Sequence, residues 1–300
     1  MQLDIVKMKE LEKEYSPSEW SIRFKDPSEV ITNHIEIVTN ESNECKKNIK
    51  YRENVAYGEG DNEKLDIYEN HLSEDAPIFV YIHGGYWVQL SKDVSAYCVR
   101  PLVESGYRVI IVEYDLCPQI TLEDLAEQIK KAGKFILNMA EENNAKSVSF
   151  CGHSAGAHLV SSMLNDKNFY NSLSGNQINL IKNVYLISGI YDLTEIQHLE
   201  ATNPDNILSL NDKSVQKLSP IYQNYEHYSR RGIKFHIFVA EYESNVFKEQ
   251  SKQFCDLLKN DGIINANYWL LEGLDHFNIV ENLSDSKYII TKIILENISN

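Results

Sequence analysis

One serine lies in a glycine-flanked motif that is typical of acyl-transfer enzymes. The segment Gly152–Gly156 is Gly-His-Ser-Ala-Gly, so the serine is Ser154. It follows the apolar run Val148–Cys151 and precedes a stretch whose apolar residues recur at helical spacing. A strand, a tight turn and a helix in this order form a nucleophile elbow, which lifts a serine hydroxyl clear of the sheet edge. The pattern therefore predicts that Ser154 is the nucleophile of an acyl transfer.

A serine nucleophile needs a histidine base, and the histidine needs a carboxylate that fixes its tautomer. In α/β-hydrolases the chain order is serine, acid, histidine, and five of the nine histidines follow Ser154. His158 falls on the helix after the elbow and His236 falls in an apolar strand. Only His276 comes just after the last apolar strand, where loops of such sheets bind ligands. We therefore expect His276 to be the base.

The acid is expected in the loop that follows the apolar strand Phe235–Val239. This loop offers no aspartate, and its carboxylates are Glu241, Glu243 and Glu249. Glu243 is favoured because the loop needs a few residues to reach the histidine. Asp192 and Asp275 are alternatives, and Asp192 is expected to brace the site by hydrogen bonding.

Acyl transfer also needs hydrogen-bond donors for the oxyanion of the tetrahedral intermediate. His83–Trp87 directly follows the apolar run Phe79–Ile82 and contains two adjacent glycines. Glycines let a backbone approach a reacting centre closely. We expect the donors to be the N–H groups of Gly84, Gly85 and Ala155.

Aromatic residues flank the predicted catalytic groups. Tyr86 and Trp87 follow the paired glycines, and Phe277 follows the predicted base. These rings could form an aromatic wall for a substrate ring. Trp87 could equally anchor the glycine loop in the core, and Phe277 is open to the same two interpretations.

Apolar strands and helical stripes alternate from residue 77 onward. The predicted strands are Ile78–Ile82, Val109–Val112, Val148–Cys151, Val184–Ile187, Phe235–Val239 and Tyr268–Leu271. Helical stripes begin at Leu122, Phe247 and Ile289. This alternation predicts an α/β fold with a mostly parallel, doubly wound sheet flanked by helices. An antiparallel pair, about 48–57 and 64–68, is expected before it.

We expect a single domain over residues 1–300, with two segments that depart from the regular pattern. Residues 1–50 are predicted to pack over the core, and Ser16–Glu19 resembles a capping box that starts a helix with Trp20, Ile22 and Phe24. Residues 195–232 break the alternation and could form a cap over the active site.

Composition narrows the range of partners and locations. The net charge of −15 argues against nucleic acid or anionic membrane as a partner. No apolar run is long enough to span a membrane, and the N-terminus lacks the apolar core of a signal peptide, so the expected location is the cytoplasm. The five cysteines show no zinc-ligand spacing, and Cys151 is expected to be a buried thiol. The oligomeric state stays open, with a homodimer as one candidate.

Most of the chain, from about residue 10 to 298, resembles the kynurenine formamidases, also called arylformamidases. These enzymes belong to the hormone-sensitive-lipase-like branch of the α/β-hydrolases. The broader likeness rests on His83-Gly84-Gly85 together with the elbow. The narrower likeness rests on the run His83–Trp87, on Glu14–Trp20, and on Tyr242-Glu243-Ser244.

The resemblance implies the triad Ser154, Glu243 and His276 on an α/β-hydrolase fold. It implies hydrolysis of N-formyl-L-kynurenine to L-kynurenine and formate through a formyl-serine, with no metal or organic cofactor. The family usually has aspartate where this chain has Glu243, and a glutamate can fill the same role. No arginine or lysine can be assigned from the sequence to the substrate carboxylate. A broad carboxylesterase and a non-catalytic binding protein on the same fold are the alternatives.

Overall fold

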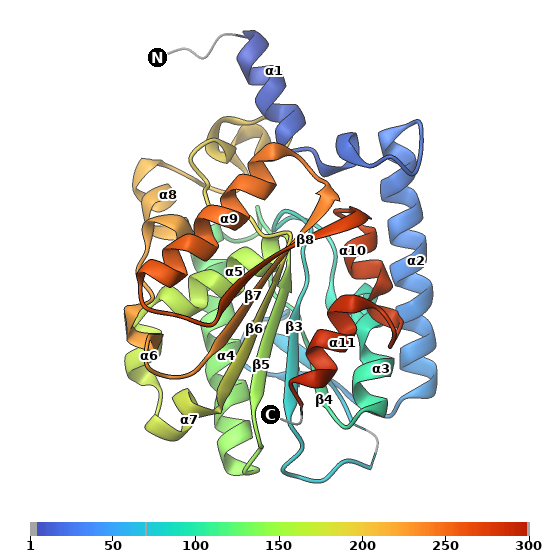
Figure 1. Cartoon of the computed structure of the whole chain (residues 1–300), viewed down its shortest axis with the longest axis vertical. Helices are drawn as coiled ribbons and strands as arrows, with labels where there is room; N and C mark the ends of the chain where they lie inside the picture. The colour runs from blue at the N-terminus through green and yellow to red at the C-terminus, as the bar shows by residue number, and fades with distance from the viewer. Residues whose placement is uncertain (1–4, 70, 299–300) are drawn as a thin grey trace.

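The computed structural model describes residues 5–69 and 71–298. Its centre is an eight-stranded sheet in the order β1-β2-β4-β3-β5-β6-β7-β8 (Figure 1). The strands are β1 Tyr51–Ala56, β2 Lys64–Tyr68, β3 Ile78–Ile82, β4 Arg108–Val112, β5 Val148–His153, β6 Ile181–Ile187, β7 Lys234–Tyr242 and β8 Ala266–Asp275. β2 is antiparallel to both β1 and β4, and the other pairs are parallel. The predicted antiparallel pair and mostly parallel sheet are confirmed.

The central strands are apolar on both faces because helices cover both sides of the sheet. In β3, Ile78, Val80 and Ile82 belong to one core, while Phe79 and Tyr81 belong to the other. The first core packs under α4 (Leu122–Glu142), α5 (Ala155–Asn165) and α9 (Asn245–Asn260). The second packs under α2 (Pro27–Asn48), α3 (Val99–Glu104), α10 (Asn278–Glu281) and α11 (Ile289–Glu296) (Figure 1). A continuous apolar run is the pattern expected of a strand buried in this way.

The helices occupy the stretches between the strands and both flanks. The α-helices are α1 Ile5–Glu14, α2 Pro27–Asn48, α3 Val99–Glu104, α4 Leu122–Glu142, α5 Ala155–Asn165, α6 Lys167–Ser172, α7 Gly175–Leu180, α8 Asp212–Leu218, α9 Asn245–Asn260, α10 Asn278–Glu281 and α11 Ile289–Glu296. The short 3₁₀ turns are η1 Pro17–Trp20, η2 Lys92–Val94, η3 Ala96–Cys98, η4 Ile196–His198, η5 Pro204–Asn206, η6 Pro220–Tyr222, η7 Glu226–Tyr228 and η8 Asn282–Ser284. The predicted stripes from Leu122, Phe247 and Ile289 lie on α4, α9 and α11.

The predicted helix start at Ser16–Glu19 is wrong. Only the single 3₁₀ turn η1 forms there, and Ser16 makes no capping bond because its hydroxyl donates to the carbonyl of Glu12. The long helix of this region is α2, whose N-terminus is capped by the side chain of Asp26 with Pro27 in the first turn. Helix α2 also extends to Asn48, so the following strand begins at Tyr51 rather than near residue 48.

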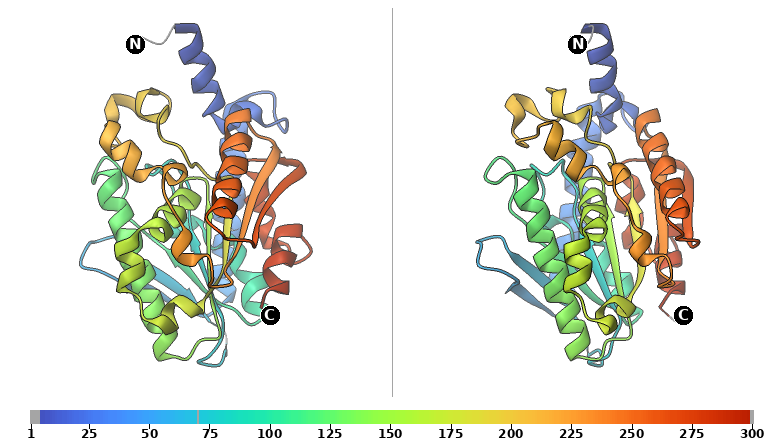
Figure 2. Two further views of the ribbon diagram at one scale, coloured as in Figure 1. Left: turned by 60° about the vertical axis from the view of Figure 1, so that its left-hand side comes forward. Right: turned by 90° about the vertical axis from the view of Figure 1, so that its left-hand side faces the viewer.

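Residues 195–232 contain η4, η5, α8, η6 and η7, with no strand among them. The part of this segment from η4 to α8, yellow to orange, lies at the same end of the molecule as α1 and the start of α2 (Figure 2). The carboxyl ends of the parallel strands point toward this end (Figure 1). Within the described ranges, no helix is long and apolar enough to cross a membrane.

All five cysteines are buried and free, including Cys151 in β5, where a buried thiol was predicted. Burial raises the pKa of the Cys151 thiol well above its usual value. A buried neutral thiol behaves as a small apolar side chain, so Cys151 contributes to core packing below the elbow.

Candidate active site

Ser154 occupies a strained turn between β5 and α5, as the motif predicts. Its backbone angles are φ 54° and ψ −118°, which a non-glycine residue rarely adopts. Its N–H donates to the carbonyl of Ile187 at 2.9 Å, which ties the turn to the end of β6. Only 2% of Ser154 is exposed. The neighbouring strand therefore holds the serine in a conformation that it would not take alone.

The two glycines of the motif are required by close backbone contacts. A Cβ added to Gly152 would lie 2.3 Å from the carbonyl oxygen of Gly156. A Cβ added to Gly156 would lie 2.1 Å from the carbonyl oxygen of Ile82 at the end of β3. Both distances are shorter than atoms tolerate, so α5 can sit against the strand ends only with glycine at these positions.

His276 follows the end of β8 and pairs with Glu243, which follows the end of β7. Its Nδ1 lies 2.6 Å from Oε1 of Glu243, and both side chains are at least 95% buried. The other oxygen of Glu243 accepts the N–H of Ala240 at 3.3 Å. Because an ionised carboxylate only accepts hydrogen bonds, Nδ1 carries the proton and Nε2 is left to act as a base. His276 and Ser154 line the same cavity.

The other candidate acids have different partners. Glu241 accepts the N–H of Gly273 at 2.7 Å, and Glu249 is exposed on α9. Asp192 accepts the hydroxyl of Tyr222 at 2.9 Å, so it braces the 195–232 segment. Among the five carboxylates considered, Glu243 is the one hydrogen-bonded to His276. Asp275, the fifth, belongs to a separate cluster beside the base.

The glycine loop after β3 lies directly against the nucleophile. A Cβ on Gly84 would come within 2.9 Å of the carbonyl of His153 and 3.2 Å of Cβ of Ser154. Gly85 has φ 99° and lines the cavity. In the described part of the chain, the N–H groups of both glycines find no backbone acceptor. Ala155 is the first residue of α5, where an N–H has no partner within the helix.

His153 is a site residue that the sequence motif contains but does not explain. Its Nε2 donates to the carbonyl of His276 at 2.9 Å, and the two rings lie 4.7 Å apart. Burial, together with the neighbouring His276 and His34, holds the pKa of His153 well below its usual value. A neutral imidazole therefore links the residue before the nucleophile to the backbone of the predicted base.

A charged cluster from the N-terminal segment holds the loop that carries His276. Arg23 lies 2.8 Å from a carboxylate oxygen of Asp275 and 2.8 Å from one of Glu281. Ser21 also donates to Asp275, and Asp275 accepts the N–H of Asn278 at 2.8 Å. Burial alone would raise the pKa of Asp275, but these hydrogen bonds and the Arg23 charge lower it. Asp275 is therefore an ionised anchor of the loop.

The catalytic groups open into a cavity of about 440 Å³. Its walls come from the N-terminal segment, the glycine loop, the elbow, the 195–232 segment and the loop after β8. The lining residues are Tyr15, Ser16, Pro17, Ser18, Ile31, His34, Ile35, Gly85, Tyr86, Val88, Gln89, Leu90, His153, Ser154, Ala201, Thr202, Pro204, Ile207, His276 and Phe277. This volume is within the range of small-molecule sites, about 300–1,000 Å³.

Two of the three predicted aromatic contacts line the cavity. Tyr86 lines it and donates its hydroxyl to the carbonyl of Tyr15 at 2.6 Å. Phe277 also lines it, 5.5 Å from the ring of His276. Trp87 does not, and its assignment to substrate binding is wrong. It is fully buried and donates to Nδ1 of His158 at 3.1 Å, so it anchors the glycine loop in the core.

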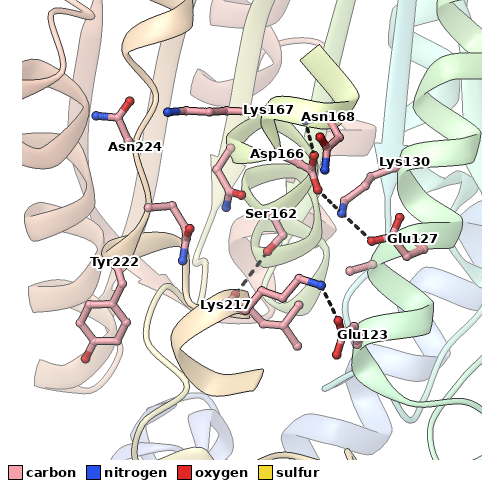
Figure 3. A pocket seen from close by; sticks show the side chains of 14 residues that line it. Glu123, Glu127, Lys130, Ser162, Asp166, Lys167, Asn168, Lys217, Tyr222 and Asn224 are labelled. Atoms are coloured by element: carbon pink, nitrogen blue, oxygen red, sulfur yellow. Dashed lines mark hydrogen bonds and ion pairs between the residues drawn. The ribbon is translucent and has the colours of Figure 1, made fainter. Parts of the chain in front are cut away.

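A second cavity, of about 410 Å³, lies between α4, α5 and α8 (Figure 3). Its charged side chains pair with one another, as Lys130 does with Glu127 and Asp166, and Lys217 does with Glu123. The serine on its wall, Ser162, donates to the carbonyl of Leu218 at 3.4 Å (Figure 3). The charged residues that line this cavity are therefore paired with one another, and the predicted catalytic groups all lie outside it.

The fold and the strained serine turn define an α/β-hydrolase. A thermophilic carboxylesterase from a metagenomic library superposes with a TM-score of 0.68 at 18% identity, covering 93% of this chain and 97% of that one. An esterase from Pyrobaculum calidifontis gives a TM-score of 0.68 at 17% identity, covering 99% and 97%. The family model BD-FAE matches residues 65–258.

Relatives that align with almost the whole chain place it in a narrower family within the α/β-hydrolases. The kynurenine formamidase of Drosophila melanogaster is 35% identical over 280 residues, covering 91% of this chain and 92% of that one. The kynurenine formamidase of Danio rerio is 31% identical over 291 residues, covering 96% of each chain. The chain belongs to the kynurenine formamidase family.

Proposed function

We propose that this protein hydrolyses N-formyl-L-kynurenine to L-kynurenine and formate. The observation that carries the proposal is the pair His276–Glu243, 2.6 Å apart, in one cavity with the strained Ser154. The identity of the substrate is inferred from the names of the relatives above, and the site contains groups suited to the reaction. Residues 195–232 would act as the cap, since Ala201, Thr202, Pro204 and Ile207 line the cavity.

The first half of the reaction would transfer the formyl group to the enzyme. Nε2 of His276 removes the proton of Ser154 while Oγ attacks the formyl carbon. The resulting oxyanion accepts hydrogen bonds from the N–H groups of Gly84, Gly85 and Ala155. Glu243 stabilises the imidazolium that forms, without taking its proton. The C–N bond then breaks, and His276 returns the proton to the aniline nitrogen of L-kynurenine.

The second half would release formate by the same groups in reverse roles. Water enters where the amine has left, and His276 removes one of its protons as the oxygen attacks the formyl-serine. The second tetrahedral intermediate collapses, the bond to Oγ of Ser154 breaks, and His276 reprotonates that oxygen. Formate leaves and the free enzyme is restored, so one water is consumed for each substrate molecule.

Relative rates on an amide and an ester test the proposal. We expect kcat/KM for N-formyl-L-kynurenine to exceed that for p-nitrophenyl acetate. A preference for the acetate ester by orders of magnitude would assign the protein to the carboxylesterases instead. Ser154→Ala should abolish both activities and labelling by a fluorophosphonate probe. Retention of either in the folded variant would contradict Ser154 as the nucleophile.

A further inference from the structure

The wall of the catalytic cavity contains no side chain that is permanently charged at neutral pH. None of its 20 lining residues is Lys, Arg, Asp or Glu. The proposed substrate carries an ammonium and a carboxylate beyond its aromatic ring. Buried charges need hydrogen-bonding partners, so the polar groups on this wall must supply the recognition.

His34 is the first such group, and it reaches the cavity from α2. Its Nδ1 lies 2.9 Å from Oε1 of Glu281, so this nitrogen carries a proton. Its ring lies 5.2 Å from that of Phe277 on the cavity wall. Nε2 makes no hydrogen bond within the described part of the chain, and it is not among the buried atoms that lack a partner. This nitrogen is therefore available to a molecule in the cavity.

Charge balance indicates what Nε2 of His34 would bind. Arg23 contributes one positive charge to the cluster beneath His34, while Asp275 and Glu281 contribute two negative charges. With its proton on Nδ1, the His34 ring leaves Nε2 as a hydrogen-bond acceptor, and the three charged side chains together carry one net negative charge. An acceptor beside a net negative charge suits the ammonium of the substrate, with which it forms a charge-assisted hydrogen bond.

Thr202 is the second group, and it comes from the 195–232 segment. The residue lines the cavity although it is only 5% exposed. Its Oγ1 is buried and has no hydrogen-bond partner in the described structure. Leaving a buried hydroxyl unpaired costs free energy, and rotation of this side chain toward a ligand in the cavity would remove the cost.

We propose that His34 and Thr202 bind the amino-acid end of the substrate, with the ammonium on Nε2 of His34. The inference rests on the proposed formamidase function and extends it to specificity. The ligand class is an aryl formamide with an α-amino-acid group. The reacting end is held by the glycine loop and the elbow, and the charged end by α2 and the 195–232 segment. The start of α2 and the part of the 195–232 segment from η4 to α8 lie at the same end of the molecule (Figure 2).

Three substrates separate recognition of the charged end from the chemistry. They are N-formyl-L-kynurenine, N-formylkynuramine, which lacks the carboxylate, and 2-formamidoacetophenone, which lacks both charged groups. In His34→Asn the amide nitrogen can still reach Glu281 but nothing replaces Nε2. We expect this variant to lower the ratio of kcat/KM for N-formyl-L-kynurenine to that for 2-formamidoacetophenone by about 10- to 100-fold. The corresponding ratio for N-formylkynuramine should fall by a similar factor, because this substrate keeps the ammonium.

Thr202→Val keeps the shape of the side chain and removes its hydroxyl. We expect KM for N-formyl-L-kynurenine to rise about fivefold, with no loss of Tm because the hydroxyl has no protein partner. Thr32→Val is the matched control, since Thr32 lies on the exposed side of α2 and bonds only to the carbonyl of Ser28. The control should leave KM unchanged.

The outcomes distinguish this inference from the proposed function. If the unaltered enzyme cleaves none of the three formamides but cleaves p-nitrophenyl acetate, the formamidase function itself fails. If it cleaves them and neither variant changes the ratio of kcat/KM for N-formyl-L-kynurenine to that for 2-formamidoacetophenone, the recognition site fails while the function stands. An equal loss on all three substrates in His34→Asn would make His34 a structural support of the His276 loop, which also overturns the inference.

Discussion

Glu241 and Glu243 differ by two positions in the chain and by their whole environment. Glu241 is half-buried and bonds to the backbone of Gly273, whereas Glu243 is 1% exposed and bonds to His276. Sequence order alone left both as candidates. The difference arises because β7 continues to Tyr242, so that only the residue after the strand end turns toward the base.

Amide substitutions at these two positions should have very different effects. Glu243→Gln can donate a hydrogen bond to Nδ1 and so favour the wrong tautomer of His276. We expect kcat to fall roughly 10³- to 10⁴-fold, as in other triads that lose their carboxylate. Glu241→Gln, the matched control, should change kcat less than threefold. Steady-state kinetics on N-formyl-L-kynurenine measure both, and the reverse order of effects would place the acid at Glu241.

The sequence predicted the types of several site residues, but it did not predict the direction in which their side chains point. Ser154 and His276 follow from the motif and from chain order. The sequence could not show whether Trp87 lines the cavity or anchors the glycine loop in the core. Tyr86 and Trp87 both adopt positive φ, at 49° and 63°. This irregular turn sends one ring to the cavity and the other to the core. No periodicity rule covers such a turn.

Helix α2 shows why sequence patterns failed to predict an entire helix. Its buried residues are Val30, His34, Val38, Ser42 and Cys45. Their spacing is helical, yet two of the five are polar, so the apolar stripe is too sparse to recognise. His34 is buried because Glu281 pairs with it from α10. A sequence pattern within a short stretch of the chain does not show contacts with residues that lie far away in the chain.

Arg23 should be needed for both stability and catalysis. Arg23→Met leaves Asp275 and Glu281 buried without their cation, and breaking such a pair costs about 3–5 kcal/mol. We expect a comparable loss in the free energy of unfolding, measured in urea. We also expect a fall in kcat, since Asp275 directly precedes His276.

Helix α2 offers a matched control for this variant. Lys46→Met removes a cation that pairs with Asp93, whose side chain is 58% exposed. Pairs of this kind contribute about 1 kcal/mol or less, so stability and kcat should hardly change. Equal effects of the two substitutions would show that the Arg23 cluster does not support the site.

At the scale of the whole molecule, the sheet was the most predictable feature. Every central strand was visible as a largely apolar run, because two cores require apolar side chains on both faces. Strand ends were less visible. β5, β7 and β8 each extend beyond their predicted limits, into His153, Tyr242 and Asp275. These extensions carry the polar residues of the site, which an apolar pattern excludes.

The buried histidines make the whole fold sensitive to acid. Burial lowers the pKa of His158 and that of His236 to about 4, and it holds the pKa of His153 well below its usual value. In the unfolded chain these rings take up protons near pH 6.5. The unfolded state thus binds more protons between about pH 6.5 and 4. Stability is full above this window and falls as the pH decreases through it.

His236→Phe should reduce this sensitivity. Both ring nitrogens of His236 lack partners, and the ring stacks on Tyr185 at 5.1 Å, so a phenyl ring can replace it. Between pH 7 and 5 the free energy of unfolding should fall by about 2 kcal/mol less in the variant than in the unaltered protein. Urea titrations at both pH values measure the difference. The exposed His71→Asn is the control, and an equal fall in all three proteins would contradict this account.

The Arg23 cluster joins residues that are synthesised far apart in time. Arg23 is 252 positions from Asp275, and His34 is 247 positions from Glu281. At about 5–20 residues per second, a ribosome needs roughly 12–50 s to cover this distance. During that interval, the buried face of α2 lacks its final partner. The enzyme can therefore become active only late in its own synthesis, and a chaperone would have time to bind the uncovered face of α2.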